Sequence, residues 1–200
     1  NIFFIDETKN QKINFKHYNG EIGEKFYTES VGAGCCVLDY NNDGFMDIFF
    51  VQGNSHSSKI ESMETSNMLF ENNKQDFINV TDNAGLKNYD YGIGCAIADY
   101  NNDGFDDIFV TNFGNDILYK NLQNGKFQDV TKKSGIKNSL WSSSATFFDY
   151  DKDGFLDLYI TNYVNFNISE NPWCGDEKNN ERKYCDPDFF EGLPDVLYKN

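Results

Sequence analysis

The sequence predicts an all-β fold made of repeated four-stranded antiparallel blades, and three observations predict it. A nine-residue loop rich in Asp, Asn and Gly recurs at residues 39–47, 99–107 and 149–157, so that successive copies begin 60 and 50 residues apart. Each copy lies between short runs of small, β-branched and aromatic residues, which are typical of strands. A second motif, Leu-aromatic-charged-Asn, follows each loop downstream. Repeats of this length, with four strands each, are typical of the blades of a β-propeller.

The strands of each blade follow one another in a constant order. The first strand precedes the loop and the second follows it, and the second motif is the third strand. The expected first strands are residues 34–38, 94–98 and 144–148, and the expected second strands are 48–51, 108–111 and 158–161. The third strands are expected at 68–72, 117–121 and 196–200, and fourth strands at 77–81 and 127–131. Residues 4–8 resemble a fourth strand and are expected to form an outer strand.

These elements divide the chain into two complete blades and part of a third. The blades are expected at residues 34–81, 94–131 and 144–200, preceded by an outer strand and a connection in residues 1–33. Closed propellers need roughly 4–8 blades, so the chain predicts a partial ring of about three blades. Further blades are expected from the rest of a longer parent chain or from another chain. Polar insertions at 52–66 and 162–194 are expected on one face of the ring.

The repeated loop carries oxygen side chains at positions 1, 3, 5 and 9, and a glycine at position 6 that allows a tight turn with positive φ. Position 7 is Phe, whose backbone carbonyl can point to the same centre. With a water or a bidentate carboxylate, these donors reach the six or seven oxygens, roughly, that suit Ca²⁺, and no His or Cys favours Zn²⁺. About three calcium ions are therefore expected, one in each loop. The predicted ligands are Asp39, Asn41, Asp43, Phe45 and Asp47; Asp99, Asn101, Asp103, Phe105 and Asp107; and Asp149, Asp151, Asp153, Phe155 and Asp157.

Other interpretations of the loops were weighed. An EF-hand needs a Glu at position 12, where this chain has Phe50, Val110 and Ile160. Flanking strands also argue against dockerin-like modules, in which a helix follows the loop directly. The remaining alternative is a set of Asx-rich turns without metal, although converging carboxylates without a cation would repel one another. The third loop has four Asp, so charge count predicts the tightest binding there if the loops are equally rigid.

The charge of the chain limits its partners. There are 32 acidic and 17 basic side chains, and the formal net charge is −15. Such a surface repels phosphate and anionic headgroups, so neither nucleic acid nor membrane insertion is expected, and no apolar run approaches the ~18 residues of a membrane span. The chain begins without Met or an apolar signal core, and we interpret it as processed or partial.

The five cysteines are of two kinds. Cys174 and Cys185 bracket a polar loop, where packing offers no reason for two thiols, and we interpret them as a disulfide formed in an oxidising compartment. The alternative is a pair of free thiols on a flexible loop. Cys35, Cys36 and Cys95 lie in runs of small residues and are expected to be free, buried thiols that act as small apolar residues.

The sequence offers no recognisable catalytic residue, and the chain is expected not to be an enzyme. His17 is expected to be structural, bonding a backbone carbonyl between blades, and His56 to be solvated. The serines at 142–144 precede a strand and are better explained by packing than by nucleophilic catalysis. A pair of acids for glycoside hydrolysis cannot be identified among so many carboxylates, but the acids that have an assigned position are metal ligands.

The chain resembles the FG-GAP/VCBS-repeat proteins of the cartilage acidic protein (ASPIC/UnbV) type, and the motifs that carry the resemblance extend over nearly all of it. The resemblance implies a calcium-loaded propeller of seven or eight blades, similar to the integrin α head, that is secreted, periplasmic or on the cell surface. The loops have Phe at position 7 where many members have another residue. The shared motifs are residues 15–20 (FKHYNG), 32–34 (GAG), 39–44 (DYNNDG), 51–53 (VQG), 91–92 (YG), the second loop at 99–107, 111–114 (TNFG), Trp141, 147–150 (FFDY), 162–163 (NY), 184–185 (YC) and 193–198 (LPDVLY).

Three functions are compatible with this sequence. The first is a calcium-stabilised binding or adhesion module, in which the insertions at 52–66 and 162–194 meet a protein or glycan ligand. The second is a non-catalytic scaffold within a secreted enzyme, and the third is a structural component of an extracellular assembly. Trp173, Phe189 and Phe190 lie in the second insertion, where contact with a ligand and packing of the insertion are equally expected.

Overall fold

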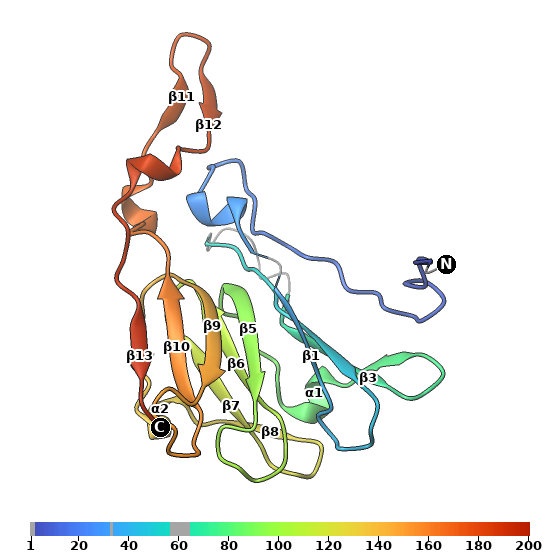
Figure 1. The fold of residues 1–200 in the computed structure, drawn as a ribbon. Helices are drawn as coiled ribbons and strands as arrows, with labels where there is room; N and C mark the ends of the chain where they lie inside the picture. Colours follow the sequence, from blue (N-terminus) through green and yellow to red (C-terminus); the bar gives the residue numbers. More distant parts are fainter. Residues whose placement is uncertain (1–2, 33, 57–64) are drawn as a thin grey trace.

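The computed structural model describes residues 3–32, 34–56 and 65–200 and consists of antiparallel sheets arranged side by side (Figure 1). The first blade is a four-stranded sheet in the order β1-β2-β3-β4, and the second is β5-β6-β7-β8. The third has three strands in the order β13-β10-β9. The all-β, four-stranded blades are therefore confirmed. The strands are β1 (Cys35–Leu38), β2 (Asp47–Phe50), β3 (Met68–Asn72), β4 (Phe77–Asn79), β5 (Gly92–Ala98), β6 (Asp107–Asn112), β7 (Ile117–Asn121), β8 (Phe127–Asp129), β9 (Ser142–Phe148), β10 (Asp157–Asn162) and β13 (Val196–Tyr198).

A short helix follows the fourth strand of each complete blade, which the sequence analysis did not predict. These helices are α1 (Thr81–Ala84) and α2 (Thr131–Ser134), and each is capped by a glycine in the left-handed region. The first threonine of each helix accepts a hydrogen bond at Oγ1 from the third strand, 2.9 Å from the N–H of Leu69 or Leu118. Among the residues that the structure describes, no helix is long and apolar enough to cross a membrane.

Apolar side chains fill the spaces between neighbouring blades. One cluster, which includes Leu38, Phe49 and Ile108, joins the first blade to the second. Another, which includes Phe109 and Ile160, joins the second blade to the third. Strand β6 lies between these clusters, and all six of its residues are buried. A strand covered on both faces has no reason to alternate apolar and polar residues, which explains the continuous apolar run in β6.

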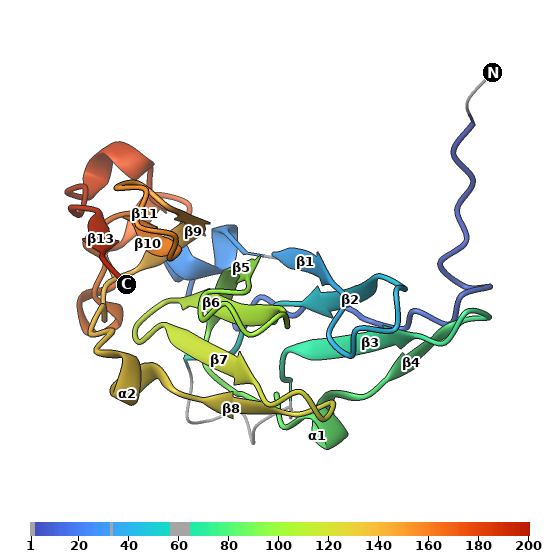
Figure 2. The same ribbon diagram turned by 60° about the horizontal axis from the view of Figure 1, so that its bottom comes forward.

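Residues 4–8 do not form the expected outer strand. Within the described residues 3–26 the backbone forms no strand, and Phe4 is 99% exposed. Residues 4–8 extend away from the three sheets (Figure 2). They form no strand because a strand is stable only beside a neighbour with which it can pair. The chain first contacts the first blade farther along, where the carbonyl of Gln11 accepts a hydrogen bond from the N–H of Phe77 at 3.0 Å. The Phe15 ring then stacks on Phe50 with centroids 4.6 Å apart.

The insertion at 162–194 extends from the third blade at the end of the molecule opposite the Asp-rich loops (Figure 1). It contains η2 (Ile168–Glu170), η3 (Pro187–Phe189) and a hairpin of β11 (Cys174–Asp176) and β12 (Glu181–Lys183). It packs on η1 (Tyr27–Ser30) through a cluster of aromatic rings. Phe190 stacks on Tyr27 with centroids 4.7 Å apart, whereas Phe189 and Trp173 are exposed. The packing interpretation therefore holds for Phe190, and the other two rings remain available for contact.

His56 is packed rather than solvated, contrary to the sequence-based expectation. Its ring stacks on Tyr91 with centroids 4.8 Å apart, and Nε2 lies 2.8 Å from the hydroxyl of Thr28. Burial lowers its pKa to about 4, so the ring is neutral at physiological pH. The reason is tertiary: η1 and β5 enclose the beginning of the insertion at 52–66. Residues 57–64 of that insertion lie outside the described residues.

Two disulfides are present, and one of them corrects the sequence analysis. Cys174 and Cys185 are joined across the insertion, as predicted. Cys36 and Cys95 are also joined, although both were expected to be free. They lie on β1 and β5, the first strands of neighbouring blades, which approach so closely that a Cβ on Gly34 would lie 2.6 Å from the Cα of Gly94. Only Cys35 is free among the described cysteines, and it is exposed rather than buried.

We expect the double variant Cys36→Ser/Cys95→Ser to unfold with a free energy about 4 kcal/mol lower, because loss of a long cross-link increases the entropy of the unfolded chain. The sequence separation is 59 residues for this bond and 11 for Cys174–Cys185. Removing the shorter link is therefore expected to cost less, about 3 kcal/mol on the same basis. Urea unfolding of both variants in a Cys35→Ser background, which prevents thiol exchange, measures the difference. Equal stability of the parent and the Cys36/Cys95 variant would contradict the inter-blade link.

Candidate functional site

The three Asp-rich loops lie together at one end of the molecule. Each connects the first and second strands of its blade, and the residue before the loop pairs with the loop's last Asp. The blades have the same orientation, so all three hairpin ends meet at the lower edge of Figure 1. The opposite end carries η1 and the insertion at 162–194. The repeats therefore build an acidic face and a separate face of loops.

Within each loop the backbone coils around the Asp at position 1. In the first loop, Asp39 accepts hydrogen bonds from the N–H groups of Asp43 and Gly44, at 3.0 and 2.8 Å. Asp99 and Asp149 accept the same pair of bonds in their loops. The position-6 glycines have φ of 85°, 87° and 90°, which confirms the predicted positive φ. Position 4 also lies in the left-handed region, although it is occupied by Asn42, Asn102 and Lys152.

The Asp at position 9 joins the loop to the third strand of its own blade. Asp47 is buried, and it accepts hydrogen bonds from the N–H of Tyr40 at 3.1 Å and of Asn72 at 2.8 Å. Asp107 and Asp157 are equally buried and accept the N–H of Asn121 and Asn200, at 2.7 and 2.9 Å. From the sequence, position 9 was expected only to be a metal ligand, and its hydrogen bond to the third strand was not predicted. The Asn that ends every third-strand motif was the available signal.

Asparagine side chains also connect each loop to the next blade. Asn42 donates to the carbonyl of Gly104 at 2.8 Å, and Asn102 donates to that of Gly154 at 3.0 Å. In the reverse direction, Asn121 donates to the carbonyl of Tyr40 at 2.8 Å, as Asn200 does to that of Tyr100. The three loops therefore form one connected layer rather than three independent turns. Sequence reasoning did not find these bonds because they join residues 50 or more positions apart.

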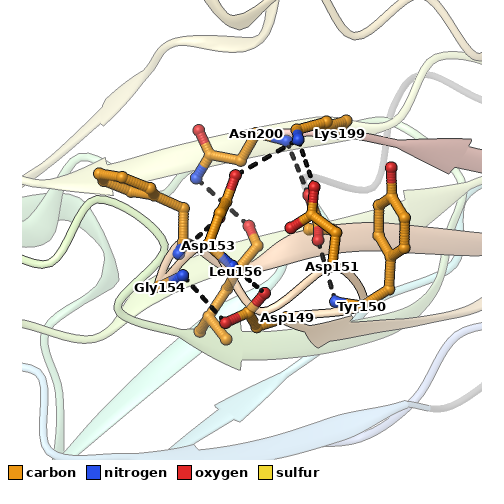
Figure 3. Close-up of polar contacts among 10 residues, drawn as sticks. Asp149, Tyr150, Asp151, Asp153, Gly154, Leu156, Lys199 and Asn200 are labelled. Atoms are coloured by element: carbon orange, nitrogen blue, oxygen red, sulfur yellow. Dashed lines mark hydrogen bonds and ion pairs between the residues drawn. The ribbon is translucent and has the colours of Figure 1, made fainter.

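The third loop brings three carboxylates together. Oxygens of Asp149, Asp151 and Asp153 all lie within 4.8 Å of one another, the single such group among the described residues. The Lys199 ammonium lies between Asp151 and Asp153 (Figure 3), 3.4 Å from the latter. Asp157 lies outside this group, because its oxygens face the backbone of β13 and Tyr150. Ligation by the carbonyls of Phe45, Phe105 and Phe155 stays a prediction.

The first two loops have Asn at position 3 and hold fewer carboxylates. Asn101 donates to Asp107 at 2.8 Å, and Asn41 donates to Asp43 at 3.4 Å. In the second loop, Oδ2 of Asp103 is buried without a hydrogen-bond donor, and the Lys120 ammonium lies 3.2 Å from it. A buried carboxylate oxygen is costly unless a donor or cation faces it. The Lys120 ammonium meets this need for Asp103, and the all-oxygen donor set of the loop fits the hard cation that the sequence predicts.

Burial changes the protonation of the position-9 carboxyls. It raises the pKa of Asp47 to about 6 and that of Asp107 to about 7, and the neighbouring loop carboxylates add to the effect. The hydrogen bond from Lys199 has the opposite effect on Asp151, whose pKa is lowered. A divalent cation beside Asp47 and Asp107 would favour their charged forms.

The remaining candidates from the sequence are structural in their surroundings. Ser142 is fully buried and donates to Asp116 at 2.8 Å, while Asn138 donates to its hydroxyl at 2.7 Å. No histidine belongs to this group among the described residues. His17 is partly buried, and this burial lowers its pKa. A hydrogen bond with the backbone of Val51 raises the pKa but does not cancel the effect of burial. Its contact agrees with the structural role expected of it.

A comparison with family models identifies the repeated unit. The model described as an FG-GAP-like repeat matches residues 39–110 and again residues 99–160, and the two matches together span more than half of the chain. Each match begins at the first Asp of a loop and extends through the second strand of the next blade. No curated protein matches the chain.

In chelator, the thermal stability is expected to fall as the pH rises from about 4 to about 7. Asp47 and Asp107 have folded pKa values of about 6 and 7, above the usual 3.8, so across this interval these carboxyls bind more protons in the folded state than in the unfolded state. Asp116, whose folded pKa is about 6, adds to this effect, and His56, whose folded pKa is about 4 instead of the usual 6.5, partly opposes it. Stability therefore decreases with pH. Calcium should reduce the decrease by favouring the charged carboxylates. Melting curves with EDTA and with calcium measure both effects, and an Asp47→Asn/Asp107→Asn variant is expected to be much less sensitive to pH. A flat profile in EDTA would contradict the assignment.

Proposed function

We propose that this chain, which belongs to the FG-GAP-like repeat family, is a β-propeller module that binds Ca²⁺ in its three Asp-rich loops and uses its other face to bind a protein or glycan. One observation carries the calcium proposal: the convergence of Asp149, Asp151 and Asp153 within 4.8 Å, in a loop that recurs in each blade.

The residues that would hold the ions are those at positions 1, 3, 5 and 9 of each loop, with the position-7 carbonyl. A bound Ca²⁺ would supply the positive charge that offsets carboxylate repulsion. Three ions would change the formal net charge from −15 to −15 + 6 = −9. Because the loops are bonded to one another through Asn42 and Asn102, an ion in one loop would also stabilise the adjoining blade.

We further propose that the module functions outside the cytoplasm, as a secreted, periplasmic or cell-surface protein. Its two disulfides support this location, because such bonds persist in oxidising compartments. The narrower assignment to the cartilage acidic protein (ASPIC/UnbV) type is also part of this proposal. It is based on the sequence motifs and not on the matched repeat model. The proposed role is binding and involves no catalytic step.

The proposed ligand face lies opposite the calcium loops, around the insertion at 162–194 (Figure 1). Trp173 and Phe189 are 41% and 63% exposed there. Phe189 also lines a hollow of about 240 Å³ with Phe166 and Glu191. Exposed aromatic rings beside polar groups are typical of the centres of binding interfaces, and the Cys174–Cys185 bond restricts the loop that carries Trp173.

Calcium is expected to raise the melting temperature of the protein. At a free concentration about 100-fold above Kd, each site adds about 2.7 kcal/mol, or roughly 5–10 °C for a domain of this size. Asp43→Ala, Asp103→Ala and Asp153→Ala should each remove part of this shift, because each removes a carboxylate of one loop. Asp188→Asn, which removes an exposed acid from η3, is the matched control. A melting temperature that does not respond to calcium or EDTA would remove the metal from the proposal.

The Trp173→Ala/Phe189→Ala variant is expected to lose binding to any glycan that the parent protein recognises on an array, by on the order of tenfold or more, as for aromatic interface centres. Ile78→Ala, which truncates an exposed apolar side chain on β4, should bind like the parent protein. The array signal measured in calcium compares all three. Unchanged binding by the double variant would exclude the insertion as the ligand face for glycans.

A further inference from the structure

We propose that one residue of each third-strand motif, Glu71, Lys120 or Lys199, determines how tightly its loop binds calcium, and that the two lysines lower the affinity of the second and third loops. The lysines of the second and third blades act as internal cations that calcium must displace, whereas the first blade has a glutamate instead. The inference rests on the proposed calcium function and concerns the order of the sites. This order differs from the one that carboxylate count alone predicts, with the third loop tightest.

The three residues occupy equivalent places. The residue before each of them, Phe70, Tyr119 or Tyr198, pairs with the residue that follows the last Asp of its loop. The residue after each of them is the Asn whose N–H binds the position-9 carboxylate. Hydrogen bonds of the residues on both sides therefore hold Glu71, Lys120 and Lys199 beside their loops. The side chain at this position differs from blade to blade, and we call it the variable residue.

In the second and third blades the variable residue contacts predicted ligands directly. The Lys199 ammonium forms ion pairs with Asp151 and Asp153 (Figure 3). The Lys120 ammonium lies 3.2 Å from Oδ2 of Asp103 and is the one cation facing that buried oxygen among the described residues. Each ammonium therefore lies where it would repel a divalent ion bound by the same carboxylates.

The first blade has the opposite arrangement. Glu71 accepts a hydrogen bond from the hydroxyl of Tyr40, which is position 2 of the loop, at 2.8 Å. Asp106 of the next blade adds another carboxylate, 3.2 Å from the N–H of Asp39. Among the described residues no ion pair reaches the carboxylates of this loop, and the nearby Lys74 ammonium lies over the Phe45 ring instead. The first loop therefore has no lysine paired with its ligands, and the residue at the variable position contacts Tyr40 rather than a ligand.

The solvent exposure of the two lysines limits how much they can weaken calcium binding. The side chains of Lys120 and Lys199 are 36% and 54% exposed, so each lysine can swing into solvent when an ion binds. A unit charge about 5 Å from a divalent ion in a water-like dielectric with physiological salt changes affinity by on the order of tenfold. We therefore expect each lysine to weaken calcium binding in its own loop by about tenfold. The second loop has the same carboxylates as the first and should bind about tenfold more weakly, whereas in the third loop Lys199 offsets the additional carboxylate of Asp151.

The test follows each loop separately in the full chain. Selective ¹⁵N-glycine labelling provides the amide signals of Gly44, Gly104 and Gly154, one in each loop, during a titration with calcium chloride. In the parent protein the Gly44 signal is expected to respond before that of Gly104. Lys120→Met and Lys199→Met should lower the calcium midpoint of their own loop by about tenfold, and Glu71→Lys should raise that of the first loop by a similar factor.

The matched control is Lys152→Met, because Lys152 lies within the third loop but forms no ion pair among the described residues. It removes the same charge without removing the contact, so its midpoint should change far less. Midpoints that stay within about twofold in Lys120→Met and Lys199→Met, or a Lys152→Met shift as large as that of Lys199→Met, would overturn the inference while leaving calcium binding intact. If no glycine signal responds to calcium in a protein that melts cooperatively, the proposed function itself fails. A charge-reversed Glu71→Lys that does not fold is replaced by Glu71→Gln, for which a smaller increase in the same direction is expected.

Discussion

The structure depends on one interaction that is repeated three times, the buried Asp at the end of each loop. Asp47, Asp107 and Asp157 are almost completely buried. Each accepts a hydrogen bond from the backbone N–H of the Asn that ends the third-strand motif. This bond joins the first hairpin of a blade to its third strand at the acidic end. Burial makes the charge costly, which explains why these carboxyls hold protons more tightly than usual in two of the loops, and why a cation at this place would stabilise the fold.

The constraint extends across the ring because neighbouring blades share it. Asn121 belongs to this bond in its own blade, and its side chain binds the preceding loop at the carbonyl of Tyr40. Apolar clusters fill the space between the blades, and the Cys36–Cys95 bond joins their first strands. Hydrogen bonding, apolar packing and cross-linking thus act between the same neighbouring blades.

The two faces divide the chemistry of the module. The repeated loops place negative charge at one end, where lysine or glutamate on the third strand adjusts it. The insertion at 162–194 places aromatic rings at the other end, with Phe190 packed and Phe189 and Trp173 exposed. A face built by repetition is suited to a repeated task such as ion binding, and a face built by insertion is suited to a particular ligand.

The sequence by itself determined the blades, their strands, the loop glycines and the Cys174–Cys185 bond, because each depends on residues near one another in the chain. Only the tertiary structure decided that Cys36 meets Cys95, that His56 is packed, and that residues 4–8 form no strand in the described chain, because these outcomes depend on which blade lies beside which. The same holds for Lys199 and the carboxylates of the third loop. Their pairing follows from strand register across a 33-residue insertion (162–194), and a period read along the chain contains no information about it.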